Sequence, residues 1–220
     1  MKNICVYCSA NKKIHENYLR DAETIGEMIA LKGYNLVYGG SDLGTMGIVS
    51  STAKKYGAKV YGVMPEKIYN FIEHEGSFCD EFILTDNMRD RKEKMDEMSD
   101  AVIALAGGFG TLDEVIEIID LKNLGYNSKP IVFLNTNNYY TDLFKYFDKV
   151  IDENFARKQL RELYYLAQTP QEVFEYLENY VPTVSPKTVD DIYVKWYNLY
   201  IMRLRSSQGE PWRTSAACLH

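Results

Sequence analysis

Several features are scarce in this sequence of 220 residues, and each scarcity argues against a class of protein. It has no run of about eighteen or more apolar residues, so it offers no candidate membrane span. Its three histidines, His15, His74 and His220, are scattered and do not indicate a zinc site. The first residues, "MKNICVYCSANKK", lack the long apolar stretch and cleavage site of a secretory signal peptide. We therefore expect a cytoplasmic protein with no membrane partner and no bound metal.

Cysteine is also scarce, and only two of the four cysteines, Cys5 and Cys8, lie close together in the sequence. Their spacing is that of a C-x-x-C pair. They fall, however, in the expected strand "NICVYCS", where residues at this spacing point to opposite faces. We therefore interpret them as two small buried residues rather than as a metal or redox pair.

Basic residues are outnumbered, with 25 lysines and arginines against 31 aspartates and glutamates, which gives a net charge of -6. Nucleic-acid backbones require a basic surface. The charge balance thus argues against a DNA or RNA partner, but it does not exclude a local basic pocket.

Strand and helix patterns alternate along the chain, as is typical of a parallel sheet. The expected strands are "NICVYCS", "YNLVYG", "KVYGVM", "EFILT", "AVIAL", "PIVFL" and "LYYLA". The expected helices cover residues 17–32, 46–56, 87–99, 112–123 and 139–153, with another after Pro170. With 46% hydrophobic and 25% charged residues, the composition is that of a soluble globular protein. The sequence predicts an α/β fold, a doubly wound, Rossmann-like parallel sheet flanked by helices.

The mass of 25.4 kDa fits one domain, which we expect at residues 1–181, followed by a C-terminal helical extension at residues 182–220. Within the extension, "VDDIYVKWYNLYIMRL" is apolar on nearly every side of a helical wheel and must be covered. We favour packing on the same subunit over a subunit interface. The last stretch, "RSSQGEPWRTSAACLH", has no period, which indicates a flexible tail or a segment foreign to the natural protein.

Two glycine-rich turns follow expected strands, "GGSDLGTMG" at residues 39–47 and "GGFGT" at residues 107–111, and each opens a helix. Ligands of open α/β sheets collect at the carboxyl ends of strands, where helix N-termini favour anions. Glycines also simply permit tight turns, so either run alone is weak evidence. The sequence has neither G-x-x-x-x-G-K-[ST] nor, after its first strand, G-x-G-x-x-G. What remains is a site for one phosphate on a smaller ligand.

An arginine lies on the apolar stripe of the helix between the two turns. In "NMRDRKEKMDEMSD", the residues Met88, Arg91, Met95 and Met98 follow helical spacing. The other charged residues, Lys92 among them, lie elsewhere on the helix, where we expect a solvated face. A structural ion pair or snorkelling is one explanation for Arg91. We favour an arginine that faces an anion.

The segment from Thr111 to Glu114 allows two interpretations. It matches the S/T-x-x-E capping box, in which both side chains satisfy N–H groups at the start of a helix. Alternatively, Glu114 is a carboxylate beside the glycine turn, where it would stabilise positive charge on a sugar carbon or orient a water molecule. Asp113 is the less attractive acid, because an acidic residue near a helix N-terminus is simply favourable.

Two motifs in order resemble those of a known family. "MRDRK" at residues 88–92 and "AGGFGTLDE" at residues 106–114 are similar to the M-x-x-R-K and P-G-G-x-G-T-x-x-E motifs of the LOG family. This family comprises cytokinin riboside 5′-monophosphate phosphoribohydrolases, once misnamed lysine decarboxylases. "VYCSA" and "YGGSDLGTMG" also resemble its first strand and first glycine loop, so the resemblance covers roughly residues 2–180.

The chain departs from the family pattern at two positions. Ala106 stands where the family usually has proline, which is expected to loosen the turn. Arg89 stands where a histidine is frequent, which is expected to alter the preference for base or substrate.

The resemblance implies an N-glycosidase that cleaves nucleoside 5′-monophosphates, such as AMP or cytokinin riboside 5′-monophosphates, to free base and ribose 5-phosphate. It implies no cofactor, and a homodimer with its sites near the subunit boundary. Arg91 and Glu114 match the family's catalytic residues. Glu114 would stabilise an oxocarbenium-like ribose, and Arg91 would anchor the phosphate or the departing base. The expected substrate-binding residues are Ser9, Gly40, Gly44, Met88, Lys92, Gly107, Gly108, Gly110 and Thr111.

Three other functions compete with this one. The first is a Rossmann-like carrier of a phosphorylated ligand without turnover, similar to molybdenum cofactor carriers; such a carrier has no need of Glu114. The second, a pyridoxal phosphate-dependent lysine decarboxylase, is disfavoured because no lysine stands out in a pyridoxal-type motif. The third, DNA processing by a related domain, is disfavoured by the acidic charge balance.

Overall fold

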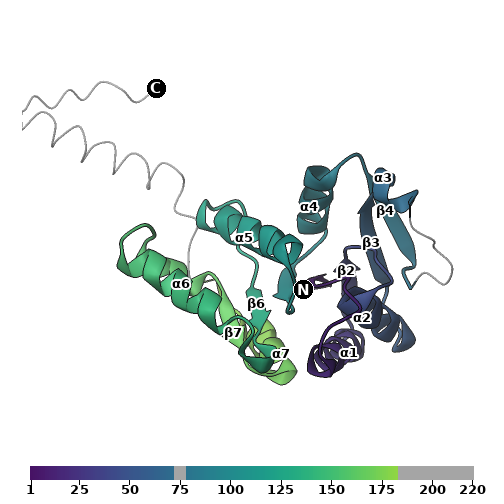
Figure 1. The fold of residues 1–220 in the computed structure, drawn as a ribbon, viewed down its shortest axis with the longest axis horizontal. Coiled ribbons are helices and arrows are strands. Elements are labelled where there is room, and N and C mark those ends of the chain that lie inside the picture. Colours follow the sequence, from purple (N-terminus) through teal and green to yellow (C-terminus); the bar gives the residue numbers. More distant parts are fainter. Residues whose placement is uncertain (72–77, 183–220) are drawn as a thin grey trace, which may run out of the picture.

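The computed structural model describes residues 1–71 and 78–182 (Figure 1). These residues form a seven-stranded sheet in the order β4-β3-β2-β1-β5-β6-β7, and every neighbouring pair is parallel. The strands are β1 (Asn3–Tyr7), β2 (Asn35–Tyr38), β3 (Val60–Pro65), β4 (Glu81–Thr85), β5 (Ala101–Ala104), β6 (Ile131–Leu134) and β7 (Tyr165–Ala167). The predicted doubly wound, Rossmann-like parallel sheet is confirmed.

Helices cover both faces of the sheet (Figure 1). They are α1 (Glu16–Leu31), α2 (Gly44–Lys55), α3 (Glu66–Tyr69), α4 (Met88–Glu97), α5 (Phe109–Asn123), α6 (Thr141–Asp152) and α7 (Pro170–Asn179), with short 3₁₀ turns η1 (Thr136–Asn138) and η2 (Lys158–Glu162). Each predicted helix of residues 1–181 is present. The short helix α3 lies in a stretch for which the sequence predicted no regular structure.

Alternating side chains of the sheet build two separate cores. Ile4 and Val6 of β1 pack with α1, α2 and α7, whereas Cys5 and Tyr7 pack with α4, α5 and residues next to α6. Cys8 belongs to the first core, so Cys5 and Cys8 lie on opposite sides and are free thiols, as predicted. Burial raises the pKa of Cys5 to about 12 and also raises the pKa of Cys8. Neither thiol therefore has the low pKa of a reactive cysteine.

The chain reverses its direction of winding between β1 and β5. From β1 it proceeds through β2 and β3 to the edge strand β4, and then returns to β5 on the other side of β1 (Figure 1). Such a switch point leaves a crevice outside the carboxyl ends of the two central strands, where ligands of this fold class bind. Both glycine turns lie at this edge, since they follow β2 and β5.

The part of the chain that the structure describes has no helix long and apolar enough to cross a membrane. Within the same residues, no group of three or more histidine, cysteine, aspartate or glutamate side chains is placed to hold a metal ion. The predicted C-terminal helix and tail fall in residues 183–220, outside the described residues. The domain division at residues 181 and 182 stays a prediction.

Candidate active site

Arg91 is buried on the inner face of α4. Asn87 caps this helix, because its side chain accepts hydrogen bonds from the N–H groups of Arg89 and Asp90. Arg91 is 5% exposed and Met95 is fully buried, as the apolar stripe predicted. The prediction for Met88 is wrong in this respect, because this first helical residue is 46% exposed.

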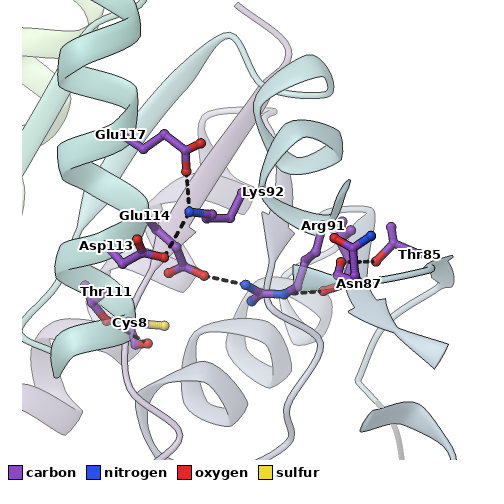
Figure 2. A network of polar contacts seen from close by, with 10 residues as sticks. Cys8, Thr85, Asn87, Arg91, Lys92, Thr111, Asp113, Glu114 and Glu117 are labelled. Atoms are coloured by element: carbon purple, nitrogen blue, oxygen red, sulfur yellow. Dashed lines mark hydrogen bonds and ion pairs between the residues drawn. The ribbon is translucent and has the colours of Figure 1, made fainter. Parts of the chain in front are cut away.

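Three segments surround the guanidinium of Arg91. Its Nε donates a hydrogen bond to the carbonyl oxygen of Val63 in β3, at 3.0 Å. Its Nη1 donates to Oε1 of Glu114 in α5, at 2.5 Å (Figure 2). Its Nη2 lies directly against Gly39, where an added Cβ would be only 2.2 Å away. Gly39 thus makes room for the arginine itself rather than for a ligand.

Glu114 is 5% exposed and pairs with Arg91. Burial raises the pKa of Glu114 above its ordinary value, and the positive charge of Arg91 opposes that increase. The capping-box interpretation is wrong, because α5 begins at Phe109, before the predicted start, and its N-cap is Gly108 without a side-chain bond. Glu114 is therefore beyond the first three helical positions, and its carboxylate faces α4 (Figure 2).

Thr111 joins the glycine loop to the central strand. Its Oγ1 donates a hydrogen bond to the carbonyl oxygen of Cys8, at 3.1 Å, just beyond β1. The side chain also explains Gly107, since a Cβ there would lie 2.1 Å from Oγ1 of Thr111. The hydroxyl of Thr111 is consequently committed to the protein, and only its backbone N–H is left for an anion.

The start of α5 is open to a ligand. A Cβ placed on Gly108 or Gly110 would meet no atom within 4 Å. The first N–H groups of a helix have no partner within the helix, and the helix dipole adds positive charge there. The N-terminus of α5 therefore combines free donors with empty space, as an anion site requires.

The other predicted loop residues pack against one another. Gly44 has a φ of +59°, and a Cβ there would lie 2.6 Å from the carbonyl oxygen of Ser9. The N–H of Ser9 donates to Oγ1 of Thr45, which in turn donates to the carbonyl oxygen of Ser9. Gly40, with a φ of +79°, packs against Met64. These contacts bring the first glycine loop to the end of β1.

Lys92 links α4 to α5 beside the buried pair (Figure 2). Its Nζ lies 3.0 Å from Oδ2 of Asp113 and 2.5 Å from Oε2 of Glu117. The expectation that Lys92 lies on a solvated face is wrong, because its side chain is only 15% exposed. In this arrangement Lys92 supports the packing of the two helices that carry Arg91 and Glu114.

Two residues that sequence reasoning missed hold the second glycine loop. The hydroxyl of Tyr139 donates to the carbonyl oxygen of Gly107, and the hydroxyl of Tyr140 donates to that of Leu105, each at 2.6 Å. No local motif distinguishes these tyrosines from the many others in the chain, so the sequence offered no signal for them.

An apolar groove lies along α5, with lining residues from that helix and from α6. Its volume is about 920 Å³, and Phe109, Leu112, Ile116, Leu143 and Phe147 are among its lining residues. Phe109, which follows the N-cap of α5, is 92% exposed. The groove and the glycine loop thus share the first turn of α5.

Comparison with known proteins identifies relatives over most of the chain. A family model described as "Possible lysine decarboxylase" matches residues 46–177. The cytokinin riboside 5′-monophosphate phosphoribohydrolase LOG3 of Arabidopsis thaliana is 35% identical over 181 residues, covering 82% of this chain and 84% of the relative. The "Probable cytokinin riboside 5′-monophosphate phosphoribohydrolase LOGL2" of Oryza sativa subsp. japonica is 37% identical over 181 residues, covering 82% and 74%.

Solved structures show the same fold. The molybdenum cofactor binding protein of Rippkaea orientalis is 25% identical with a TM-score of 0.62, covering 81% of this chain and 96% of that chain. DNA processing protein A of Helicobacter pylori shares the fold alone, at 14% identity and a TM-score of 0.54, covering 82% of each chain. The sequence relatives are more specific than these structural likenesses, and they show that the chain belongs to the LOG family of cytokinin riboside 5′-monophosphate phosphoribohydrolases.

Proposed function

We propose that this protein hydrolyses the N-glycosidic bond of nucleoside 5′-monophosphates, either AMP or cytokinin riboside 5′-monophosphates. The products are the free base and ribose 5-phosphate. The observation that carries the proposal is the buried pair of Arg91 and Glu114, which lies beside an open anion site at the switch point of the sheet. The names of the sequence relatives support the same reaction.

The 5′-phosphate binds at the N-terminus of α5 in this proposal. The backbone N–H groups from Gly108 to Thr111 donate to it, and the space beside Gly108 and Gly110 admits its oxygens. Because these groups supply most of the recognition, a nucleoside without the phosphate is expected to be a poor substrate.

Glu114 and Arg91 are the proposed catalytic residues. As the bond between C1′ and the base nitrogen breaks, positive charge develops on the ribose, and the carboxylate of Glu114 stabilises it. Water then adds to C1′, and its released proton balances the one that the departing base takes up. Arg91 anchors the phosphate or the base while its Nε stays bound to Val63. The reaction needs no metal or organic cofactor.

The remaining proposed substrate-binding residues surround this centre from three elements. Ser9, Gly40 and Gly44 lie where the first glycine loop meets the end of β1. Met88 is exposed at the start of α4, free to contact a base. Lys92 contributes through its two ion pairs with α5, which hold the helices of Arg91 and Glu114 together.

We also propose that the protein is a cytoplasmic homodimer. The apolar groove beside α5 and the exposed Phe109 support an interface that would place the second subunit next to the glycine loop. Light scattering after size exclusion measures the mass directly, and a monomer at micromolar concentration would contradict this part of the proposal.

A carrier of a phosphorylated ligand is the second candidate function. The structural likeness to the molybdenum cofactor binding protein of Rippkaea orientalis favours it, and the anion site would serve it equally well. A carrier, however, has no need of a carboxylate buried beside that site, and Glu114 is such a carboxylate. The lysine decarboxylase suggested by the family label is disfavoured, because Lys92 is held by two carboxylates.

The decisive experiment compares Glu114→Gln with Asp113→Asn. Glutamine keeps an oxygen that accepts from Arg91 but loses the charge, so turnover of AMP and isopentenyl AMP should fall on the order of 10²- to 10⁴-fold. Asp113, the neighbouring acid, is exposed and pairs with Lys92, and its substitution should change turnover by less than about 3-fold.

Free base is measured by chromatography, and binding of ribose 5-phosphate and the melting temperature are measured alongside. Arg91→Lys should also lose most activity, because lysine lacks the planar guanidinium that donates two parallel hydrogen bonds to a phosphate. Wild-type turnover in a folded Glu114→Gln protein would refute the proposed mechanism. Binding without turnover in the wild type would favour the carrier.

A further inference from the structure

Two consecutive tyrosines form hydrogen bonds with the backbone of the second glycine loop. The hydroxyl of Tyr139 donates to the carbonyl oxygen of Gly107, and that of Tyr140 to the carbonyl oxygen of Leu105. The two accepting carbonyls bracket Ala106. Glycine leaves a backbone free to adopt many conformations, so a glycine loop keeps one shape only if other groups fix it.

The tyrosines are themselves held rigidly after β6. Asn137 and Asn138 have φ values of 53° and 60°, a left-handed turn that asparagine tolerates better than most residues. The side chain of Asn135 then accepts a hydrogen bond from the N–H of Tyr140, at 2.9 Å. The ring of Tyr139 packs edge-on against Tyr18 of α1 and against Tyr140, with centroids 5.8 and 5.0 Å apart. The Tyr139 hydroxyl therefore has a fixed position.

Holding a carbonyl oxygen also directs the next N–H group. A trans peptide is planar, and its C=O and N–H point in opposite directions. Because Tyr139 binds the carbonyl oxygen of Gly107, the N–H of Gly108 points away from Tyr139. No described residue accepts from this N–H, and the space beside Gly108 is open. The hydroxyl of Tyr139 thus orients a donor that is free for an anion.

We propose that Tyr139 is a positioning residue of the phosphate site, which fixes the peptide between Gly107 and Gly108 so that its N–H faces the ligand. The inference rests on the proposed function, since it assigns a further residue to the same site. Tyr140 binds the carbonyl oxygen of Leu105 from within the core, where it is 1% exposed, so its loss would disturb folding as well. Tyr139 is 46% exposed, and its hydroxyl can be tested by itself.

The test is Tyr139→Phe, which removes one oxygen and keeps the ring contacts. One lost hydrogen bond at the loop should weaken binding of ribose 5-phosphate by about 10-fold and raise the KM for AMP similarly, with kcat changed by less than about 2-fold. A merely structural role would lower the melting temperature and leave affinity alone. With ribose 5-phosphate bound, amide exchange at Gly108 should become faster than in the wild-type complex. Tyr126→Phe, at an exposed tyrosine outside the site, is the matched control and should change neither quantity.

Calorimetry with ribose 5-phosphate keeps this inference separate from the proposed hydrolysis. A wild-type protein that binds the sugar phosphate but cleaves neither AMP nor isopentenyl AMP would refute hydrolysis, and the ratio of affinities would still decide the role of Tyr139. Equal affinities of the wild type and Tyr139→Phe, both folded, would overturn the proposal.

Discussion

The loops at residues 39–47 and 107–111 both follow a strand and open a helix, but their glycines face different neighbours. In the first loop, a Cβ on Gly39 would meet Arg91, one on Gly44 would meet the carbonyl oxygens of Ser9 and Asn11, and one on Gly47 would meet Asp42. All four distances are 2.6 Å or less. This loop uses glycine to let the protein pack against itself.

The second loop has the opposite character. The space beside Gly107 is occupied by Thr111, whereas Gly108 and Gly110 face open space. The first loop therefore packs closely around Arg91, while the second is the loop that we propose receives the ligand. Glycine content alone does not distinguish these uses, because both loops follow strands at the same edge of the sheet. Substitutions that add one methyl group do distinguish them.

The largest expected effect is that of Gly44→Ala. Its φ of +59° disfavours any Cβ, and that Cβ would lie 2.5 Å from the backbone oxygen of Asn11. We expect a loss of unfolding free energy on the order of 3 kcal/mol or more, measured by urea denaturation. A loss below about 1 kcal/mol would show that the first loop is not packed as described.

Gly39→Ala should damage the chemistry more than the fold. The new methyl group displaces Nη2 of Arg91, and we expect turnover of AMP to fall about 10²-fold, or about 2.7 kcal/mol. In an Arg91→Lys background, which lacks Nη2, the same substitution should have a much smaller effect on unfolding free energy. Equal effects in both backgrounds would mean that Gly39 does not act through Arg91.

Gly110→Ala should separate binding from stability. The residue is helical and its Cβ would meet no atom, so alanine should leave stability unchanged or raise it by up to about 1 kcal/mol. The same methyl group occupies space proposed for the phosphate, and the KM for AMP should rise about 10-fold. If stability falls while the KM stays constant, the two loops do not differ in the proposed way.

The smallest effect concerns the ion pair between Arg91 of α4 and Glu114 of α5, which follow the first and the second loop in the sequence. Burial raises the pKa of Glu114, so the acid-side midpoint of the kcat/KM profile should lie at a higher pH than the pKa of an ordinary glutamate. A raised pKa also means that the folded state binds this proton more tightly. The contribution of Glu114 to stability is therefore present at low pH and is lost as pH rises through its pKa.

Glu114→Gln, compared with the wild type between pH 4 and 7, should lack this component of the pH dependence of unfolding. Parallel stability curves for the two proteins would contradict the raised pKa.

The order of strands and helices was predictable because hydrophobic periodicity and turn residues agree along the chain. The start of α5 was not. Its first turn contains Phe109 and Gly110, which look like loop residues, and Thr111 has the chemistry of an N-cap. The hydroxyl of Thr111 instead bonds to Cys8, 103 residues away, and no local pattern reveals such a partner.

Part of the candidate site was predictable, because a charged residue occupied a position that the helical periodicity assigns to an apolar one. Arg91 was identified because a charge stood on an apolar stripe, and the structure buries it there. The exposure of Met88 was not foreseen, because a helical wheel does not show which turns of a helix have packing neighbours. Tyr139 and Tyr140 were missed for a similar reason, since their contacts depend on the neighbouring strands β5 and β6.

The contacts of Arg91 have a consequence for how the protein folds. Its guanidinium touches Gly39 and Val63, which belong to the half of the sheet from β1 to β4, and Glu114, which follows β5 in the other half. A chain in which only the first half had formed would hold a buried arginine without its carboxylate, a state that costs several kcal/mol. This penalty couples the two halves into one cooperative folding transition. The proposed catalytic pair of Arg91 and Glu114 therefore assembles only when both halves have formed.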